Sequence, residues 1–539
     1  MLADDIAAVL AESGPVTAAD LAERLGLSAG QVSFMLFASH GRFRCDTGSP
    51  PRWRLAERPL SRLSCLPQVE DDRERSPVPR TLDLAGLSPR PFERARLSPR
   101  PRPSASLGLY AWQLDALRAW EDSGWRGVIE AVTGTGKTMV GIAAALDELD
   151  RRGQVVVLVP TVELQHQWAA QLEARMSVLG RAGRMGAGAS NSLSTHDVLV
   201  AVVNSARAKD LRPVRRGGLL IADECHRYGS AANRLALDPR FSRRLGLSAT
   251  YARDDDGNLA WLDPYFGGTC FRLGYARAVA DAIVASFDVA LVGVRFAPDE
   301  QMLYEDLSDE MKALFGRLVG DHGIPAQPFE AFMRAVAMLA DSDSPGSAVA
   351  RAYVRAMRKR RRLLAETTAK DGIVSLLVPA FSAADRAIVF TQSIAVAERA
   401  RRALAGCGLR AAAVHSHMAG RDRVEVLRRF AAGQLDVLAA PRVLDEGIDV
   451  PAADLAVIVG ASRTRRQMVQ RMGRVLRRKA DGRRARFAVV FVEGTVEDPS
   501  FGGHEAFLEE IVTVAGNVAV FPAETVASRP GALLEALMP

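Results

Sequence analysis

The chain has 539 residues, of which 48% are hydrophobic and 25% are charged, and its formal net charge is +7. This length is too great for a single hydrophobic core, so we expect two to four domains of a soluble globular protein. No apolar run approaches the ~20 residues that cross a bilayer, which argues against a membrane protein. The five cysteines form no CxxC pair, which argues against a disulfide framework and a structural zinc site.

The N-terminus and the excess of basic residues bear on location and partners. Asp4 and Asp5 stand where a secretory signal would be basic, so we expect a cytoplasmic protein with no membrane partner. A net charge of +7 fits a polyanionic partner, but over this length it is only a mild indication.

Residues 1–57 have the pattern of a small separate unit. Two amphipathic helices, at 6–14 and 18–25, precede a third, AGQVSFMLFAS (29–39), and FRCDTGSPPRWRL (43–55) has the pattern of a hairpin. Three helices with a β-wing resemble a winged helix-turn-helix, whose third helix can enter the major groove of DNA. Because this third helix is largely apolar, packing against a protein fits it as well as DNA contact.

Beyond this unit the chain divides by composition and periodicity. Residues 58–107, rich in Pro and Arg, are expected to form a semi-rigid linker. From residue 108, short β-branched runs alternate with helical stretches and end in polar motifs, which predicts α/β domains with doubly wound parallel sheets. The expected units are a winged helix-turn-helix-like domain at 1–57, the linker at 58–107, a first α/β domain at 108–275, a helical connector at 276–375, a second α/β domain at 376–515 and a C-terminal tail at 516–539.

The segment AVTGTGKT (131–138) follows one β run and precedes a helical stretch. Glycines let backbone N–H groups turn inward around phosphate oxygens, and Lys137 can then reach the β- and γ-phosphates while Thr138 offers a hydroxyl to Mg²⁺. We therefore predict a phosphate-binding loop formed by Thr133, Gly134, Thr135, Gly136, Lys137 and Thr138.

The segment LLIADECH (219–226) supplies the acidic partners of this loop. Four apolar residues bring Asp223 to the carboxyl edge of the sheet, where open α/β sheets bind ligands. Asp223 is expected to hold Mg²⁺, mostly through water, and Glu224 to polarise the attacking water.

This order of motifs, followed by Ser248-Ala249-Thr250, resembles the superfamily 2 helicases from residue 109 to about 495. The resemblance implies two tandem RecA-like domains that hydrolyse ATP with Mg²⁺ between them. Its further matches are LYAWQLDAL (109–117), with Gln113 at the adenine edge; VLVPTVELQHQW (157–168), with Pro160 and Thr161 on nucleic acid; IVFTQS (388–393), with Thr391 and Gln392; VLDEGIDVP (443–451), with Gly447 and Asp449 coupling nucleotide to strand; and QRMGRVLR (470–477).

The last of these motifs implies catalytic cations on the second domain. Gln470, Arg474 and Arg477 share one helix face by their i, i+4, i+7 spacing. Arg474 and Arg477 match the arginine fingers of the family, which stabilise charge on the γ-phosphate once the domains close. Such a residue contributes ~10³–10⁵ in rate in related phosphate-loop enzymes.

The stretch SATYARDDDG (248–257) resembles the xeroderma pigmentosum group B branch of these helicases. There an Arg-Glu-Asp motif follows the Ser/Thr-Ala-Thr segment, and Arg253-Asp254-Asp255 stands in its place, with Asp for Glu at 254. The resemblance implies a role in DNA engagement and strand opening for this motif together with Ser248 and Thr250. A metal-dependent nuclease site and a surface loop without function are the alternatives.

The function implied is that of an ATP-dependent DNA helicase or translocase on single-stranded or forked DNA, with little sequence preference. Three alternatives remain: a duplex translocase that does not unwind, a DNA-binding regulator with an ATPase switch, and an RNA helicase. The basic segment YVRAMRKRRRLL (353–364) fits both a phosphate-tracking helix and a solvated one. Protein partners are not predicted.

Overall fold

The computed structural model describes most of the chain from residue 103 onward and short segments before it. The described residues are 2–13, 16–25, 43–45, 52–55, 103–176, 179–215, 218–253, 256–441, 453–460, 475–476, 478, 481–501, 511 and 514–539.

A sheet of eight strands forms the first α/β domain, in the order β11-β4-β10-β9-β5-β8-β6-β7. The pairs are parallel except β6 with β7. The strands are β4 (Arg126–Ala131), β5 (Val155–Val159), β6 (Ala182–Gly186), β7 (Ala189–Ser190), β8 (Val198–Val202), β9 (Leu219–Asp223), β10 (Arg243–Ser248) and β11 (Thr269–Leu273). The central strand β5 is buried along its whole length because helices cover both faces of a parallel sheet.

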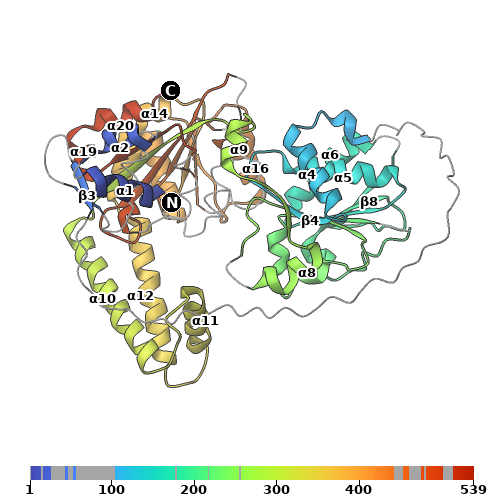
Figure 1. The fold of residues 1–539 in the computed structure, drawn as a ribbon, viewed down its shortest axis with the longest axis horizontal. Helices are drawn as coiled ribbons and strands as arrows, with labels where there is room; N and C mark the ends of the chain where they lie inside the picture. The colour runs from blue at the N-terminus through green and yellow to red at the C-terminus, as the bar shows by residue number, and fades with distance from the viewer. Residues whose placement is uncertain are drawn as a thin grey trace.

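The helices of this domain follow the predicted alternation. In Figure 1, α4, α5 and α6 lie on one side of the sheet and α8 on the other. Their bounds are α4 (Ala111–Asp122), α5 (Lys137–Asp150), α6 (Val162–Met176), α7 (Val203–Ala206) and α8 (Asp263–Phe266), with 3₁₀ turns η1 (Pro103–Leu107), η2 (Cys225–Gly229) and η3 (Asn233–Ala236), and the π-helical turn η4 (Asn258–Leu262). The predicted doubly wound α/β fold is confirmed.

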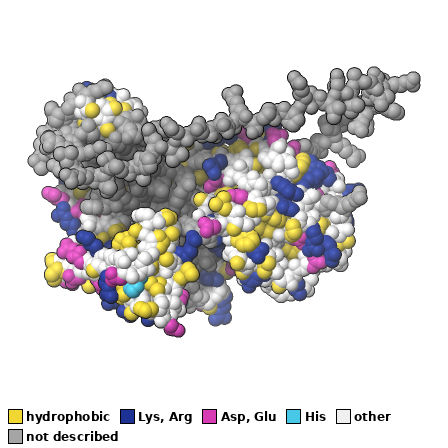
Figure 2. Space-filling model, turned by 60° about the horizontal axis from the view of Figure 1, so that its bottom comes forward, with side chains coloured by type: hydrophobic (Ala, Val, Ile, Leu, Met, Phe, Trp, Pro, Cys, Tyr) yellow, Lys and Arg dark blue, Asp and Glu magenta, His cyan; other side chains and the backbone are white. Residues whose placement is uncertain are grey.

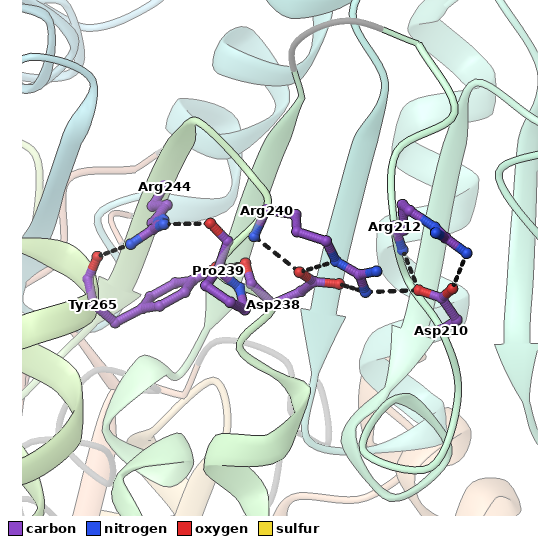
Figure 3. Close-up of polar contacts among 7 residues, drawn as sticks. All are labelled: Asp210, Arg212, Asp238, Pro239, Arg240, Arg244 and Tyr265. Atoms are coloured by element: carbon purple, nitrogen blue, oxygen red, sulfur yellow. Dashed lines mark hydrogen bonds and ion pairs between the residues drawn. The ribbon is translucent and has the colours of Figure 1, made fainter.

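Arginine side chains hold together the edge of this sheet at which the strands begin (Figure 3). Arg240 Nη2 lies 2.7 Å from Asp210 Oδ1, and its Nε donates to Asp238 Oδ1 at 2.8 Å. The buried guanidinium of Arg244 donates to the carbonyls of Pro239 at 2.7 Å and Tyr265 at 3.0 Å. These contacts lie at the edge opposite the predicted motifs, so they stabilise the domain without entering the site.

The second sheet has seven parallel strands in the order β14-β15-β13-β16-β17-β12-β18. The strands are β12 (Phe287–Val294), β13 (Ala387–Phe390), β14 (Ala411–Ala413), β15 (Val437–Ala440), β16 (Leu455–Ile458), β17 (Ala485–Val492) and β18 (Asn517–Phe521). The helices around it are α13 (Ala369–Leu376), α14 (Val378–Ala383), α15 (Ile394–Gly406), α16 (Gly420–Ala431), α19 (Ala523–Ser528) and α20 (Pro530–Leu537). Helix α9 (Tyr275–Ala280) contacts both domains, because Arg277 bonds to Asp115 of α4 and Tyr275 packs against Phe287 of β12.

Two of the predicted boundaries are wrong. Strand β12 falls in the predicted helical connector 276–375, yet it pairs with β17 over eight residues and belongs to the second sheet. Strand β18 falls in the predicted tail 516–539, yet it pairs with the other edge of β12. Both errors have one physical cause, which is that neither strand pairs with a neighbour in the sequence. Strand β12 pairs with β17, almost 200 residues later, and β18 pairs with β12, which lies at the other end of the domain.

The helices predicted as a connector are an insertion in the second domain. They are α10 (Pro298–Gly320), α11 (Phe329–Ala340) and α12 (Ser347–Glu366), and they stand out from the sheet between β12 and β13 (Figure 1). They enclose a small apolar core of their own around Leu318, Phe332 and Tyr353. The basic side chains of Arg355, Arg358, Lys359 and Arg362 on α12 are exposed.

Part of the N-terminal unit is described. Helices α1 (Leu2–Ser13) and α2 (Ala18–Leu25) accompany a sheet of β1 (Val16–Thr17), β2 (Phe43–Cys45) and β3 (Arg52–Leu55), in the order β1-β3-β2. The pairing of β2 with β3 is antiparallel, as the predicted hairpin requires. The predicted third helix and the linker to residue 102 lie outside the described residues.

The surface carries mixed charge. Figure 2 shows one face on which Lys and Arg side chains lie in separate groups among Asp and Glu. The positive net charge is therefore not gathered into one field on this face. Among the described helices, none is both long and apolar enough to cross a membrane.

A buried ion pair ties α13 to the loop after β17 in the second domain. Lys370 is fully buried, and its Nζ lies 2.6 Å from Glu497 Oε2 and 2.8 Å from the carbonyl oxygen of Leu364. Removal of one partner from such a pair leaves an uncompensated buried charge.

We expect Lys370→Met to lower the free energy of unfolding of the second domain by about 3–5 kcal/mol, because Glu497 then stays buried without its cation. Urea denaturation followed by far-UV circular dichroism measures this loss. All six tryptophans precede residue 262, so their emission reports separately on the rest of the chain. The exposed Lys312→Met on α10 is the control. A loss below about 1 kcal/mol for Lys370→Met would contradict the prediction.

Candidate active site

The predicted phosphate-binding loop joins β4 to α5. Gly134 and Gly136 have φ of +85° and +87°, which the left-handed turn requires, and α5 begins at Lys137 directly after Gly136. The buried hydroxyl of Thr135 donates to the carbonyl of Val132 at 2.7 Å and holds the turn closed. The N-terminus of α5 therefore presents its free N–H groups in the loop, as anion binding requires.

Lys137 lies folded back on this loop. Its Nζ donates to the carbonyl oxygen of Ala131 at 2.7 Å. Burial lowers the pKa of Lys137, and the negative charges of Glu224 and Asp223 oppose that shift. A buried ammonium that is held mainly by a carbonyl is available to a phosphate oxygen, which would supply a full negative charge.

The sheet register brings three motifs together at one edge. Strand β10 lies between β4 and β9, with Ser248 opposite Glu130 and Leu247 opposite Asp223. The loop after β4, the Asp-Glu pair after β9 and the Ser-Ala-Thr segment after β10 therefore lie side by side, as predicted.

Asp223 and Glu224 occupy the centre of this edge. Asp223 Oδ1 accepts from the backbone N–H of Glu224 at 3.0 Å, and Oδ2 accepts from the indole Nε1 of Trp168 at 2.7 Å. Glu224 has φ of +50°, a strained value for a residue with a side chain. Within the described part of the chain, its Oε2 is buried without a hydrogen-bond partner. A buried carboxylate oxygen that accepts no hydrogen bond is suited to accept a proton from water.

His226 connects this pair to the next motif. Its Nδ1 lies 3.0 Å from the Ser248 hydroxyl and 3.5 Å from Glu224 Oε2, and the Ser248 hydroxyl donates to the carbonyl of Thr250 at 2.7 Å. Ser248 is fully buried and is thus linked through His226 to Glu224. His226 was not predicted as a site residue, although it ends the D-E-x-H segment that the sequence displays.

Arg253 also contacts the acidic motif. Its guanidinium donates to the carbonyl of His226, and a Cβ added to Gly229 would lie 2.9 Å from Arg253 Cδ. Arg253 therefore packs against the turn η2, which directly follows Asp223 and Glu224. Its neighbours Asp254 and Asp255 lie outside the described residues.

Gln113 is buried between α4 and the phosphate-binding loop. Its Oε1 accepts from Tyr110 N at 2.9 Å, and its Nε2 donates to the carbonyl of Gly136 at 3.0 Å. The side chain is only 2% exposed. Its described contacts are thus with the protein, and the contact with adenine remains a prediction.

The residues predicted to touch nucleic acid differ in exposure. Pro160 and Thr161 follow β5, are partly exposed, and lead into α6, where Leu164 N donates to Thr161 Oγ1 at 3.3 Å. Thr391, in contrast, is fully buried and donates to the carbonyl of Ser393 at 3.1 Å, so its hydroxyl shapes the start of α15. Gln392 beside it is partly exposed. The other predicted residues, Gly447, Asp449, Gln470, Arg474 and Arg477, lie outside the described residues.

The donors at this edge fit Mg²⁺. Asp223 supplies carboxylate oxygens and Thr138, on the first turn of α5, supplies a hydroxyl, and Mg²⁺ prefers oxygen ligands. In the described part of the chain, no group of three or more His, Cys, Asp or Glu residues could hold a metal ion by itself.

Family models match both domains. The model described as "Type III restriction enzyme, res subunit" matches residues 106–253, and the model described as "Helicase conserved C-terminal domain" matches residues 370–479. In both α/β domains the chain is therefore similar to the superfamily 2 helicases.

The similarity to individual helicases extends over most of the chain. The DNA 3'-5' translocase XPB2 of Sulfurisphaera tokodaii is 27% identical over 370 residues, 68% of this chain and 78% of that protein. The Rad25 protein of Halobacterium salinarum is 29% identical over 427 residues, 78% of this chain and 60% of that protein. The DNA 3'-5' helicase XPB of Mycobacterium tuberculosis is 25% identical over 417 residues, 75% of this chain and 65% of that protein. Within the superfamily, the chain is therefore XPB-like, and it spans less than two thirds of the latter two proteins.

The environment of Asp223 predicts that Mg²⁺ binding at this carboxylate would depend on pH. Burial raises the pKa of Asp223 to about 6, and the charge of Glu224 raises it further, whereas the Trp168 N–H and Lys137 oppose the rise. Below pH 6 the carboxyl is protonated and loses its affinity for a cation. We expect the Mg²⁺ concentration for half-maximal ATPase to rise by about tenfold per pH unit below 6. Mg²⁺ titrations between pH 5 and 8, corrected for protonation of ATP, measure this; a constant requirement between pH 5 and 7 would contradict it.

Proposed function

We propose that the chain is an ATP-dependent DNA helicase or translocase that moves along DNA by opening and closing its two RecA-like domains. The observation that supports this most is the joining of the phosphate-binding loop, Asp223-Glu224 and Ser248 at one sheet edge, in a chain similar to XPB proteins. Two of those relatives are described as a DNA 3'-5' translocase and a DNA 3'-5' helicase.

ATP hydrolysis is assigned to the edge of the first sheet. The α5 N-terminus and Lys137 bind the phosphates, Gln113 lies beside the loop for the adenine, and Glu224 Oε2 accepts a proton from the attacking water. Asp223 and Thr138 would hold Mg²⁺, which neutralises charge on the phosphates when bound. Thr133, Gly134, Thr135 and Gly136 form the turn around the phosphates.

Arg474 and Arg477 are proposed to reach the γ-phosphate from the second domain, with Gln470 on the same helix face. Contacts of the residues beside them support this. Leu476 accepts from Ala285 N at 2.8 Å through its carbonyl, and Arg478 donates to the carbonyl of Ala282 at 3.3 Å. The arginine segment is thus attached to the stretch that leads from the first domain into β12, so domain movement carries the arginines with it.

DNA is proposed to lie across both domains. Pro160, Thr161 and Arg253-Asp254-Asp255 would act on the first domain, and Gln392, Gly447 and Asp449 on the second. Because such contacts are mostly to the phosphate backbone, binding has little sequence preference and weakens steeply with salt.

One set of assays tests the function. ATPase rates are measured with single-stranded DNA, duplex DNA, forked DNA and RNA, followed by strand displacement on the fork. Stimulation by DNA with strand displacement supports a helicase, whereas removal of a protein block from duplex DNA without strand separation indicates a translocase. Stimulation by RNA alone, or by no nucleic acid, would overturn the proposal.

Glu224→Gln should lower the rate of ATP hydrolysis by about 10²–10⁴-fold, because the amide cannot accept the proton of the attacking water. ATP affinity, measured by equilibrium binding, should remain close to the wild-type value. Glu173→Gln, on the exposed face of α6, is the control. Near-normal turnover of Glu224→Gln would remove this residue from the catalytic role.

Arg474→Ala should lower turnover by about 10³-fold or more while ATP affinity changes little, because the cation acts on charge that develops during transfer. Steady-state ATPase and nucleotide binding separate the two effects. The control is Arg421→Ala, whose guanidinium is exposed. A variant that loses only its affinity for DNA would show that Arg474 is not a finger.

A further inference from the structure

We infer that Trp168 is a positioning residue that couples nucleic acid at the start of α6 to the magnesium-binding carboxylate of Asp223. The inference rests on the proposed function, since it takes Pro160 and Thr161 as nucleic-acid contacts. The inference is argued from the contacts of the Trp168 indole, which lies on α6 and touches both α5 and the end of β9.

The indole fixes the orientation of the Asp223 carboxylate. Trp168 is fully buried on α6, and its Nε1 donates to Asp223 Oδ2 at 2.7 Å. The other oxygen accepts from the backbone N–H of Glu224, so among the described residues each oxygen has one hydrogen-bond donor. Each oxygen of an ionised carboxylate has a further lone pair, which can face a cation or its water ligands. A group that orients a metal ligand in this way typically changes metal affinity 10–100-fold when it is lost.

The ring is also wedged against the helix that follows the phosphate-binding loop. A Cβ added to Gly141 of α5 would lie 2.5 Å from Cη2 of Trp168 and 3.3 Å from its Cζ3. The position thus admits only glycine without movement of the indole. Trp168 therefore contacts both the acidic motif and the helix whose N-terminus binds phosphate.

Helix α6 provides the connection to nucleic acid. Thr161 begins its first turn, and Trp168 lies seven residues further, ~10 Å along the helix. Between them, Gln165 is buried and donates to the carbonyls of Met185 at 2.8 Å and Val200 at 2.9 Å. These bonds attach α6 to β6 and β8. The indole of Trp168 connects the same helix to Asp223, at the end of β9. Thr161 and Trp168 thus lie on one continuous helix, and a change in the position of its first turn on nucleic-acid binding can reach Asp223 through the indole.

The test compares two tryptophan variants of the full chain. Trp168→Phe keeps an aromatic ring and removes the N–H donor. Trp112→Phe is the matched control, because Trp112 is 1% exposed in the same domain and, within the described residues, its Nε1 has no hydrogen-bond partner. ADP affinity is measured calorimetrically with and without Mg²⁺, and ATPase with and without single-stranded DNA.

For Trp168→Phe we expect unchanged ADP affinity without Mg²⁺, at least a tenfold smaller gain in ADP affinity from Mg²⁺, and reduced stimulation of ATPase by DNA. Trp112→Phe should match wild type in all three. Gly141→Ala, which displaces the indole while Trp168 and Asp223 remain, should act in the same direction as Trp168→Phe and replaces it if that variant does not fold.

Three results would overturn the inference. The first is that Trp168→Phe behaves like Trp112→Phe. The second is that Trp168→Phe loses the same ADP affinity with and without Mg²⁺. The third is that Trp168→Phe loses the gain in ADP affinity from Mg²⁺ but keeps full stimulation of its ATPase by DNA. Absence of stimulation in the wild-type chain would instead show failure of the proposed function, and with it the coupling. Failure of the proposed function thus appears in the wild-type chain, whereas failure of the inference alone appears only in the comparison of the variants.

Discussion

The alignment of three parallel strands at one edge of the first sheet is the constraint on which the site depends. Because β10 pairs with both β4 and β9, the segments that follow these strands leave the sheet at the same level. A slip of one residue in a parallel register would turn Asp223 and Ser248 to the opposite face of the sheet. The burial of β5 and β9 along their whole length, and of β10 after Arg243, makes such a slip costly, because it would move apolar side chains away from the helices that cover them. Catalytic geometry is therefore a consequence of core packing.

Burial at this edge leaves several charged groups incompletely satisfied by the protein. Lys137 is held chiefly by a carbonyl, and burial raises the pKa of Asp223. Glu224 has a strained backbone, and among the described residues its Oε2 accepts no hydrogen bond. Each of these states costs free energy in the protein alone, and each is relieved by a group that a nucleotide with its cation brings. In the proposed function, the negative phosphates would pair with Lys137 and the cation with Asp223. The site is in this sense organised in advance for the charges of its substrate.

The sequence predicted those parts of the fold and site that depend on local pattern. The strand–loop–helix around Lys137 and the apolar run before Asp223 carry their structure in their own residues, so their positions agree with the sheet that forms. The place of β12 could not be predicted in the same way, because its eight partners in β17 lie almost 200 residues later in the chain. The hydrogen bond from Trp168 to Asp223 could not be predicted from the sequence for a related reason. A tryptophan on an amphipathic helix has the pattern of a core residue, and only the folded sheet shows which acceptor its N–H meets.

The contacts between the two domains are of unequal strength, and this difference bears on movement. The ion pair between Arg334 of α11 and Asp256 spans the helical insertion and the first domain at 3.5 Å, but both side chains are more than half exposed. An exposed pair of this kind contributes between zero and about 1 kcal/mol, which is too little to hold two domains together. The stretch 282–285, in contrast, is bonded through its backbone to Leu476 and Arg478, and Phe287 packs edge-on against Phe487 within the second sheet. The stretch 282–285 is thus attached firmly to the second domain. Bending is therefore expected before residue 282, between the first sheet and the arginine-bearing segment. A hinge at that point lets the second domain turn as one body, with its arginines, relative to the edge that holds Lys137 and Glu224.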